Sequence, residues 1–332
     1  MYTDEDLNLA VENKIFTQGA VEAFRDSMSL AKNTPLVDEE NFKFVGGFND
    51  FFVVIACCLL LFSSIYVLKP ISESVALFCF VGLSWGLSEF FILKRKMSLP
   101  AIVLLVAFVG GSFFFSLSLF LQASEVAIIL ATAIATASAY CHWLRFNVPI
   151  TVAAGTVALI GFVVAIVMSA FPNAKTLMLG LVSLCGMATF LLAMYWDASD
   201  IERVTQKSDV AFWLHLVSAP LVIHPMFSML DVFDESQTMI SMSLVIALYL
   251  LMTVISIAID RRAFMVSALA YVLYALSSII NNNGDVGYSF ALTGVFMGAA
   301  LLLLSAFWQP ARQHIVKILP LSMKKYLPVI VP

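Results

Sequence analysis

Residues 197–225, DASDIERVTQKSDVAFWLHLVSAPLVIHP, join a charged loop to an apolar helix that carries two histidines and two prolines. Prolines and ionisable side chains are costly inside an apolar helix. They gather here more densely than in the rest of the chain, which consists mainly of plain apolar runs. The sequence therefore predicts membrane-spanning helices and marks this stretch as the place to look for a function.

The composition supports this class of protein. The chain has 332 residues, of which 61% are hydrophobic and only 12% are charged, whereas soluble domains carry about 25% charged residues. A chain this apolar cannot hide its side chains in one water-soluble core, so it belongs in a bilayer. The net charge of -4 is too small to indicate a nucleic-acid partner.

The predicted fold class is all-α, a polytopic membrane helix bundle with about ten transmembrane helices, each near the ~20 residues that cross the hydrocarbon layer. The domains are a cytoplasmic helical leader and linker at 1–48, a ten-span transmembrane domain at 49–308 and a cytoplasmic C-terminal tail at 309–332. The spans are expected at 49–68, 71–93, 99–121, 124–143, 147–170, 176–196, 209–231, 238–258, 263–281 and 287–308. Two halves of five spans would allow an inverted repeat, but the halves show no convincing sequence similarity. Small residues spaced four apart predict close helix contacts within the bundle, namely Gly82 with Gly86, and Ala127, Ala131, Ala135 and Ala139.

The positive charges alternate between the two sides of this arrangement. Of the 18 Lys and Arg residues, all but Lys69 and Lys175 fall in the terminal segments or in the loops after the second, fourth, sixth and eighth spans. Cytoplasmic loops carry an excess of these residues, so both termini are expected in the cytoplasm. Trp143, Trp196 and Trp308 fall at the predicted cytoplasmic ends, as in an aromatic belt.

The leader is predicted to form two short helices with a thin apolar stripe, the first capped by Thr3 and the second by Thr17. One interpretation is an extension that rests on the membrane domain. The other is a hairpin at residues 1–32 that docks a protein partner.

Most ionisable residues of the spans lie near span ends. Glu73 and Glu125 fall in first turns, where the helix dipole favours an acid. Glu89 is expected to reach the interface or to pair there, and His142 is expected to be solvated. The middle of the bundle is almost free of carboxylates, which argues against an ion-driven carrier of charged substrates.

The seventh span is the exception because it holds His215 and His224, which lie on opposite faces of a straight helix. Pro220 and Pro225 are predicted to kink this helix. We expect each histidine to donate to a backbone carbonyl, such as one that a proline releases. The alternative is that both histidines and Trp213 line a cavity that holds a substrate or relays protons.

The loop before this span is predicted to form a short surface helix, with Asp200 and Arg203 paired at i,i+3. Asp209 and Ser208 are expected to satisfy exposed amides at the start of the seventh span. A lid or gate over that span is the alternative for the loop. The candidate binding residues are therefore Trp213, His215, His224, Asp209 and Arg203, with structural kinks at Pro220 and Pro225.

Enzyme templates such as H-E-x-x-H, G-x-S-x-G or a phosphate-binding loop do not occur in the sequence. The five cysteines have no metal-type spacing and are interpreted as small apolar fillers. We therefore expect no catalytic residues, no metal and no cofactor.

Three stretches carry a resemblance to a known group: TDEDLNLAVENKIFTQGAVEAFR at 3–25, GFNDFFVVIA at 47–56 and SDVAFWLHLVSAPLVIHP at 208–225. In these the chain resembles an uncharacterised family of bacterial multi-spanning inner-membrane proteins. The opening helix is also similar to the short helical leaders of other families with domains of unknown function. The resemblance implies a bacterial inner membrane and assigns no role to any residue.

The expected function is that of a permease-like protein for a small neutral or amphipathic solute, with membrane lipids as its other partners. The rival is a non-transporting scaffold or envelope-stress sensor that uses residues 1–32 as a partner contact. An integral membrane enzyme is the third alternative.

Overall fold

The structure is a computed structural model that describes residues 4–24, 48–120, 122, 124–171, 175–201, 203, 205–230, 239–281, 286–320 and 324–328. These residues form helices and turns, with no strand among them, so the all-α prediction is confirmed. The chain divides into two compact units, residues 1–43 with 331–332 and residues 44–330.

The first unit contains helix α1 (Asp4–Glu12) and a second helical segment at residues 18–24. The hydroxyl oxygen of Thr17 accepts a hydrogen bond from the Ala20 amide at 3.3 Å, so the predicted cap of the second helix is confirmed. Thr3, the other predicted cap, lies outside the described residues. The unit leaves large apolar side chains exposed, namely Leu9, Ile15, Phe16 and Phe24.

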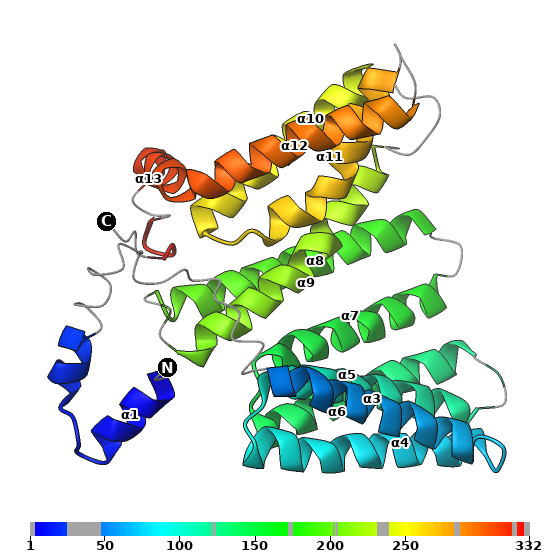
Figure 1. The fold of residues 1–332 in the computed structure, drawn as a ribbon. Helices are drawn as coiled ribbons and strands as arrows, with labels where there is room; N and C mark the ends of the chain where they lie inside the picture. Colours follow the sequence, from blue (N-terminus) through cyan, green and yellow to red (C-terminus); the bar gives the residue numbers. More distant parts are fainter. Residues whose placement is uncertain are drawn as a thin grey trace. The chain divides into compact units, whose positions relative to one another are not determined.

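The second unit contains ten helices at the ten positions that the apolar runs predict (Figure 1). They are α3 (Phe48–Leu68), α4 (Glu73–Ser88) with the π-helix η1 (Glu89–Lys94), α5 (Ser98–Ser118), α6 (Glu125–Phe146), α7 (Ile150–Ala170), α8 (Lys175–Ala198), α9 (Gln206–Ser228), α10 (Met239–Ile259), α11 (Ala263–Asn281) and α12 (Val286–Ala306). Within the part of the chain that is described, eight helices are long and apolar enough to cross a membrane. These helices indicate a membrane-embedded protein.

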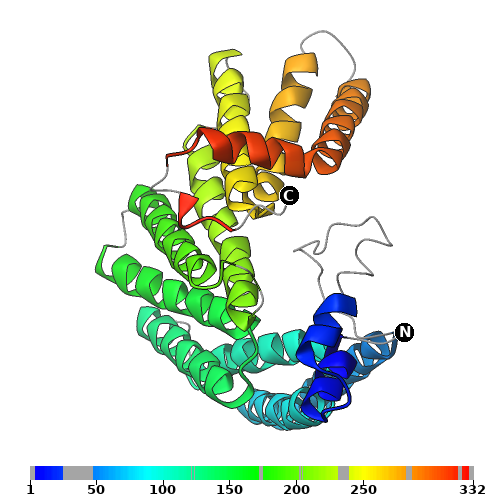
Figure 2. The same cartoon turned by 90° about the vertical axis from the view of Figure 1, so that its left-hand side faces the viewer.

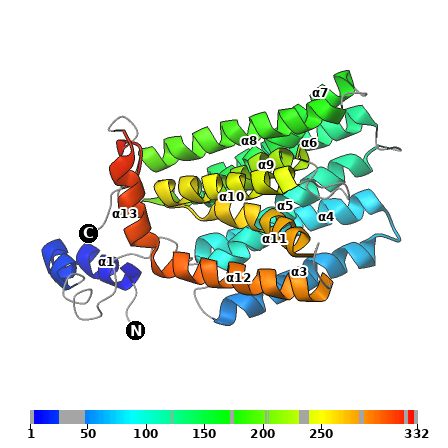
Figure 3. The same ribbon diagram turned by 90° about the horizontal axis from the view of Figure 1, so that it is seen from above.

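An eleventh helix of this unit, α13 (Trp308–Ile318), lies in the segment that the sequence assigns to the tail. The chain bends by 73° between the end of α12 and α13. In Figure 2 and Figure 3, α13 is drawn in orange to red and runs across the direction of the neighbouring helices. Because Trp308 and Val316 are buried, one face of α13 packs on the bundle.

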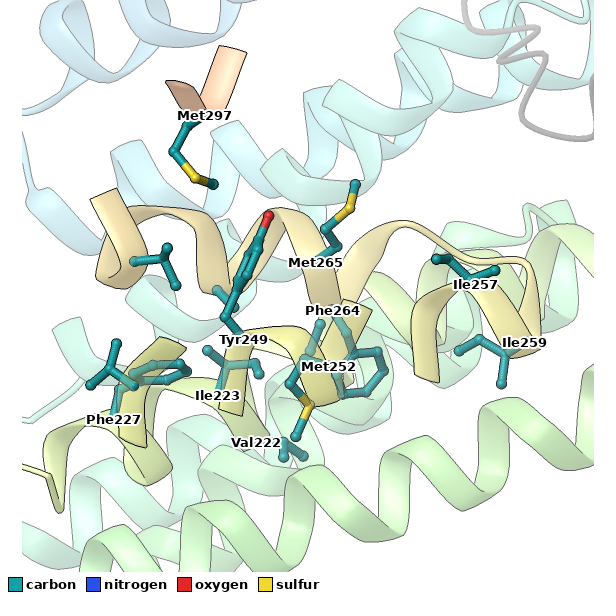
Figure 4. Packing of buried hydrophobic residues seen from close by; sticks show 14 of the residues in the cluster. Val222, Ile223, Phe227, Tyr249, Met252, Ile257, Ile259, Phe264, Met265 and Met297 are labelled. Atoms are coloured by element: carbon teal, nitrogen blue, oxygen red, sulfur yellow. The ribbon is translucent and has the colours of Figure 1, made fainter. Parts of the chain in front are cut away.

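The helices of this unit pack around separate cores. Helices α3 to α7 bury two clusters of side chains, one with Leu105 and Ala135 and the other with Leu61 and Leu104. Helices α8 to α13 bury another set, in which Val222, Phe227 and Met252 lie close together (Figure 4). A smaller cluster joins α6 and α7 to α8 and α9, and we call the line where α7 meets α9 the seam. This third cluster thus links the packing of α3 to α7 with that of α8 to α13.

Small residues explain part of this packing. Ala127, Ala131, Ala135 and Ala139 are all buried, so the predicted close-packing face of α6 is confirmed. Gly82 and Gly86 do not behave in the same way, because a methyl group at either would meet no heavy atom within 4 Å. The interpretation of G-x-x-x-G as a helix contact is therefore wrong.

Candidate functional site

Asp197, in the last turn of α8, lies at the centre of a group of buried charged residues. Its side chain is 2% exposed, and the Arg261 guanidinium donates to both carboxylate oxygens, from Nη2 to Oδ1 at 2.6 Å and from Nε to Oδ2 at 3.3 Å. His215 of α9 places Nε2 3.0 Å from Oδ2. An ionised carboxylate can only accept, so Nε2 of His215 is the donor. One carboxylate thus joins α8, α9 and the turn between α10 and α11.

Asp260, the neighbour of Arg261 in that turn, gathers a second set of donors. The Trp308 indole donates from Nε1 to Oδ1 at 2.6 Å. Arg203 and Arg312 bring Nη1 to 3.4 Å and 3.5 Å from Oδ2. This carboxylate therefore joins the connection between α8 and α9 to α13.

Arg203 links the two carboxylates. Its side chain is only 3% exposed, and its Nε lies 3.9 Å from Oδ1 of Asp197. Its Nη2 donates to the Ile259 carbonyl at 3.1 Å. We call Asp197, Arg203, His215, Asp260, Arg261 and Arg312 the buried charge cluster. Charges away from water are costly unless they are paired, and here every guanidinium of the cluster lies against a carboxylate.

The connection between α8 and α9 differs from its prediction. The described residues from 199 to 205 form turns instead of a helix, and Arg203 has a positive φ of 55°. Asp200 does not need a helix to be satisfied, because its carboxylate accepts from the amide and hydroxyl of Thr205 at 2.9 and 2.6 Å. The predicted surface helix is therefore wrong, and the side chain of Arg203 points into the cluster.

The start of α9 also differs from its prediction. Thr205 is the capping residue, and its hydroxyl oxygen accepts from the Lys207 amide at 3.3 Å. Ser208 is buried and its carbonyl and hydroxyl oxygens accept from Arg261 at 3.2 Å, so it belongs beside the cluster. Asp209 lies exposed in the first turn of α9.

The two histidines of α9 lie in different surroundings. His215 is fully buried and donates to Asp197, so the prediction of a backbone carbonyl as its partner is wrong. His224 is exposed, and its Nδ1 lies 2.5 Å from the Tyr271 hydroxyl of α11. Both prolines lie inside the continuous helix α9. Because His215 contacts Asp197 and His224 contacts Tyr271, the structure does not bring the two histidines together.

Trp213 is half-buried and packs with Trp143 and Trp196 against Ala153 and Leu214, where α6 and α7 meet α8 and α9. An apolar recess of about 240 Å³ lies at the seam and shares Val217 with this cluster. Its lining residues are Val157 and Ile160 of α7 with Leu216, Val217, Pro220 and Leu221 of α9. Trp213, His215 and His224 are not part of this lining.

A separate polar site joins η1 to α6. Glu89 accepts from Nε and Nη2 of Arg145, both at 2.8 Å. His142, one turn earlier on α6, is fully buried beside Trp85 and Phe146. The prediction of a solvated His142 is therefore wrong, because aromatic side chains from its own helix and from α4 cover the ring.

Sequence reasoning missed four of the six residues of the charge cluster, namely Asp197, Asp260, Arg261 and Arg312. The charge pattern assigns Arg261 to a cytoplasmic loop, Arg312 to the tail and Trp308 to an aromatic belt, and it assigns no role to Asp260. Trp308 is 6% exposed and donates a hydrogen bond to Asp260, so its interpretation as part of an aromatic belt is wrong. The available signal was an Asp-Arg pair directly after an apolar run, with Asp197 directly at the end of another.

The cluster offers charge pairing and hydrogen bonding, and it contains no cysteine or serine nucleophile. Among the residues that the structure describes, no group of three or more His, Cys, Asp or Glu side chains is placed to hold a metal ion.

No family model matches the chain, and neither a curated protein nor a solved structure matches it.

Proposed function

We propose that the chain is a permease-like protein of a bacterial inner membrane that carries a small neutral or amphipathic solute. In this proposal it has ten spans and both termini lie in the cytoplasm. The observation that carries the proposal is the apolar recess at the seam. Aliphatic side chains and Pro220 line it, and none of the lining residues is ionisable. Such a surface suits an apolar group and not an ion.

The position of the recess supports transport. Many transporters consist of two helix groups, bind their substrate at the interface between the groups and rock one group against the other. Here α7 belongs to one group and α9 to the other, and the recess lies between them. A solute in this position would contact both groups at once.

The distribution of charge supports a cytoplasmic orientation of the cluster end. The cluster lies where α8 ends and α9 begins, the side on which the sequence collects its Lys and Arg residues. Lys94, Arg95, Lys96 and Lys207 are exposed at helix ends that the alternating topology assigns to the same side. An excess of such residues is typical of the cytoplasmic side.

The test uses the purified full-length protein in liposomes. Stopped-flow light scattering would follow the entry of urea, glycerol, erythritol and 1,2-butanediol after an osmotic step. Val157→Trp fills the recess, and Leu60→Trp places the same side chain on α3 at a position of equal exposure, 49% in both cases. We expect the wild type and Leu60→Trp to speed the entry of at least one solute, and Val157→Trp to abolish that gain. Entry no faster than in protein-free liposomes for the whole panel would overturn the proposal.

A second candidate function is a scaffold or sensor that binds a partner protein through the leader. It is favoured by Leu9, Ile15, Phe16 and Phe24, which the leader's own fold leaves exposed. Exposed apolar side chains in one short segment mark interaction sites. Crosslinking in cells should then capture one partner with the full chain and lose it when residues 1–34 are deleted. Unchanged crosslinking after the deletion would exclude this candidate.

A further inference from the structure

Asp260 and Arg261, two adjacent residues of the α10–α11 turn, hold different parts of the protein. Arg261 binds the end of α8 through Asp197 and the start of α9 through Ser208. Asp260 binds α13 through Trp308 and Arg312. Adjacent side chains on one rigid turn thus connect the C-terminal part of the chain with the connection between α8 and α9.

The C-terminal part is held as a unit. Arg312 contacts Asp260 through Nη1 and donates from Nη2 to the Pro328 carbonyl at 2.8 Å. Trp308, Val316 and Leu327 are buried in the core that α8 to α13 share. The opposite side of α13 carries the exposed Lys317 and Ile318. We call α13 and residues 324–328 the C-terminal clamp.

The contact that links the clamp to the α8–α9 connection involves two unusual backbone positions. Arg203 and Asp260 have φ angles of 55° and 58°, in the left-handed region that non-glycine residues seldom adopt. Their side chains form an ion pair with each other, and Arg203 also reaches the backbone carbonyl of Asp260 at 3.5 Å. Such backbone conformations persist only where the surroundings hold them.

We propose that the C-terminal clamp is a conformational latch that holds the α8–α9 connection closed through Asp260 and Arg203. When the clamp lifts, Asp260 loses the Trp308 and Arg312 donors. Because Trp308 and Arg312 are contacts that fix the position of Asp260, Asp260 and its partner Arg203 can then leave the left-handed conformation together. The described residues between 199 and 209 gain freedom while the helices of the α3–α7 group keep their packing. Buried charge networks are a poor source of stability and are known to specify one arrangement among several, which fits this use.

Hydrogen exchange of the full-length protein in nanodiscs tests the latch, and its readout does not depend on transport. Arg312→Gln and Trp308→Phe each remove one contact from the clamp to Asp260, and Lys317→Gln alters the exposed side of α13 as the matched control. We expect amides in 199–209 to exchange about tenfold faster in both variants, as in a local opening. The control and the amides of α5 should match the wild type. Faster exchange confined to 308–328 would overturn the proposal.

The reverse experiment uses the reciprocity of coupling. Asp197→Asn weakens the α8–α9 side of the network. Amides of α13 should then exchange faster, although Arg203, His215 and Arg261, which contact Asp197, all lie outside α13. Where a variant also speeds exchange in α5, it is globally destabilised, as we expect most for Asp197→Asn, and Trp308→Phe then decides. Unchanged exchange of α13 in Asp197→Asn would overturn the latch.

Discussion

Arg261 donates two hydrogen bonds to the carboxylate of Asp197, although 64 residues separate them in the chain. The pair fixes the start of α11 against the end of α8, and both side chains are 2% exposed. A guanidinium and a carboxylate fit each other in this two-point geometry, which fixes orientation as well as distance. The buried charge cluster therefore depends on Asp197 more than on any single cation.

The substitution Asp197→Asn should destabilise the protein strongly. It keeps the size of the side chain but leaves Arg261 and Arg203 facing a neutral amide, and breaking a buried ion pair costs about 3–5 kcal/mol. The midpoint of thermal unfolding in detergent would measure the loss. The control is Asp209→Asn, because Asp209 is exposed and surface substitutions stay within about 0.5 kcal/mol. Equal unfolding midpoints for the two variants would contradict the importance of the cluster.

Substitutions of His215 test its role as a donor to Asp197. Gln keeps an N–H group that can reach the carboxylate, whereas Leu leaves one buried carboxylate oxygen without this donor, at a cost of about 1–3 kcal/mol. His215→Leu should therefore unfold at a lower temperature than His215→Gln. In the background of Asp197→Asn the difference between Leu and Gln should shrink, because the charged acceptor is gone. The same difference in both backgrounds would mean that His215 acts through another partner.

The sequence predicts the helices of this protein well because an apolar run of sufficient length is a local property. The ten helix positions, the Thr17 cap and the buried alanine face of α6 all follow from residues that are neighbours in the chain. The partners of the polar residues do not. His215 meets a carboxylate 18 residues earlier, and His142 is covered by a ring from another helix. A position near a span end therefore does not establish that a charge is solvated.

The glycines show the same limit. G-x-x-x-G spacing indicated Gly82 and Gly86 as contact points, yet space is open at both. The close approach occurs at Gly186 of α8, where an added methyl carbon would lie 2.8 Å from the carbonyl carbon and Cβ of Leu221 in α9. Spacing within one helix does not reveal which side of the helix meets a neighbour.

Gly186→Ala should consequently weaken the packing of α8 on α9. The clash involves the backbone of Leu221, which cannot move aside as a flexible side chain would, and such overpacking costs about 1–3 kcal/mol. Gly82→Ala is the matched control, because alanine is the better helix former by about 1 kcal/mol and no atom opposes it within 4 Å. Unfolding midpoints should fall for Gly186→Ala and hold or rise for Gly82→Ala. The opposite order would show that α8 and α9 are farther apart than described.

The membrane topology can be tested at α11 and α12, because helix length alone does not decide whether these two helices cross the membrane. Helix α11 has 19 residues and is therefore about 28 Å long at ~1.5 Å per residue, close to the ~30 Å of the hydrocarbon layer. We expect reporter fusions after Lys96 and Lys325 to report the cytoplasm, and fusions after Lys175 and Asp285 to report the periplasm. The alternation of Lys and Arg residues is the reason. If only one of α11 and α12 crosses, the fusion after Lys325 reports the periplasm while the one after Lys96 stays cytoplasmic. That result would exclude ten spans and would move α13 and Lys317 to the outer surface.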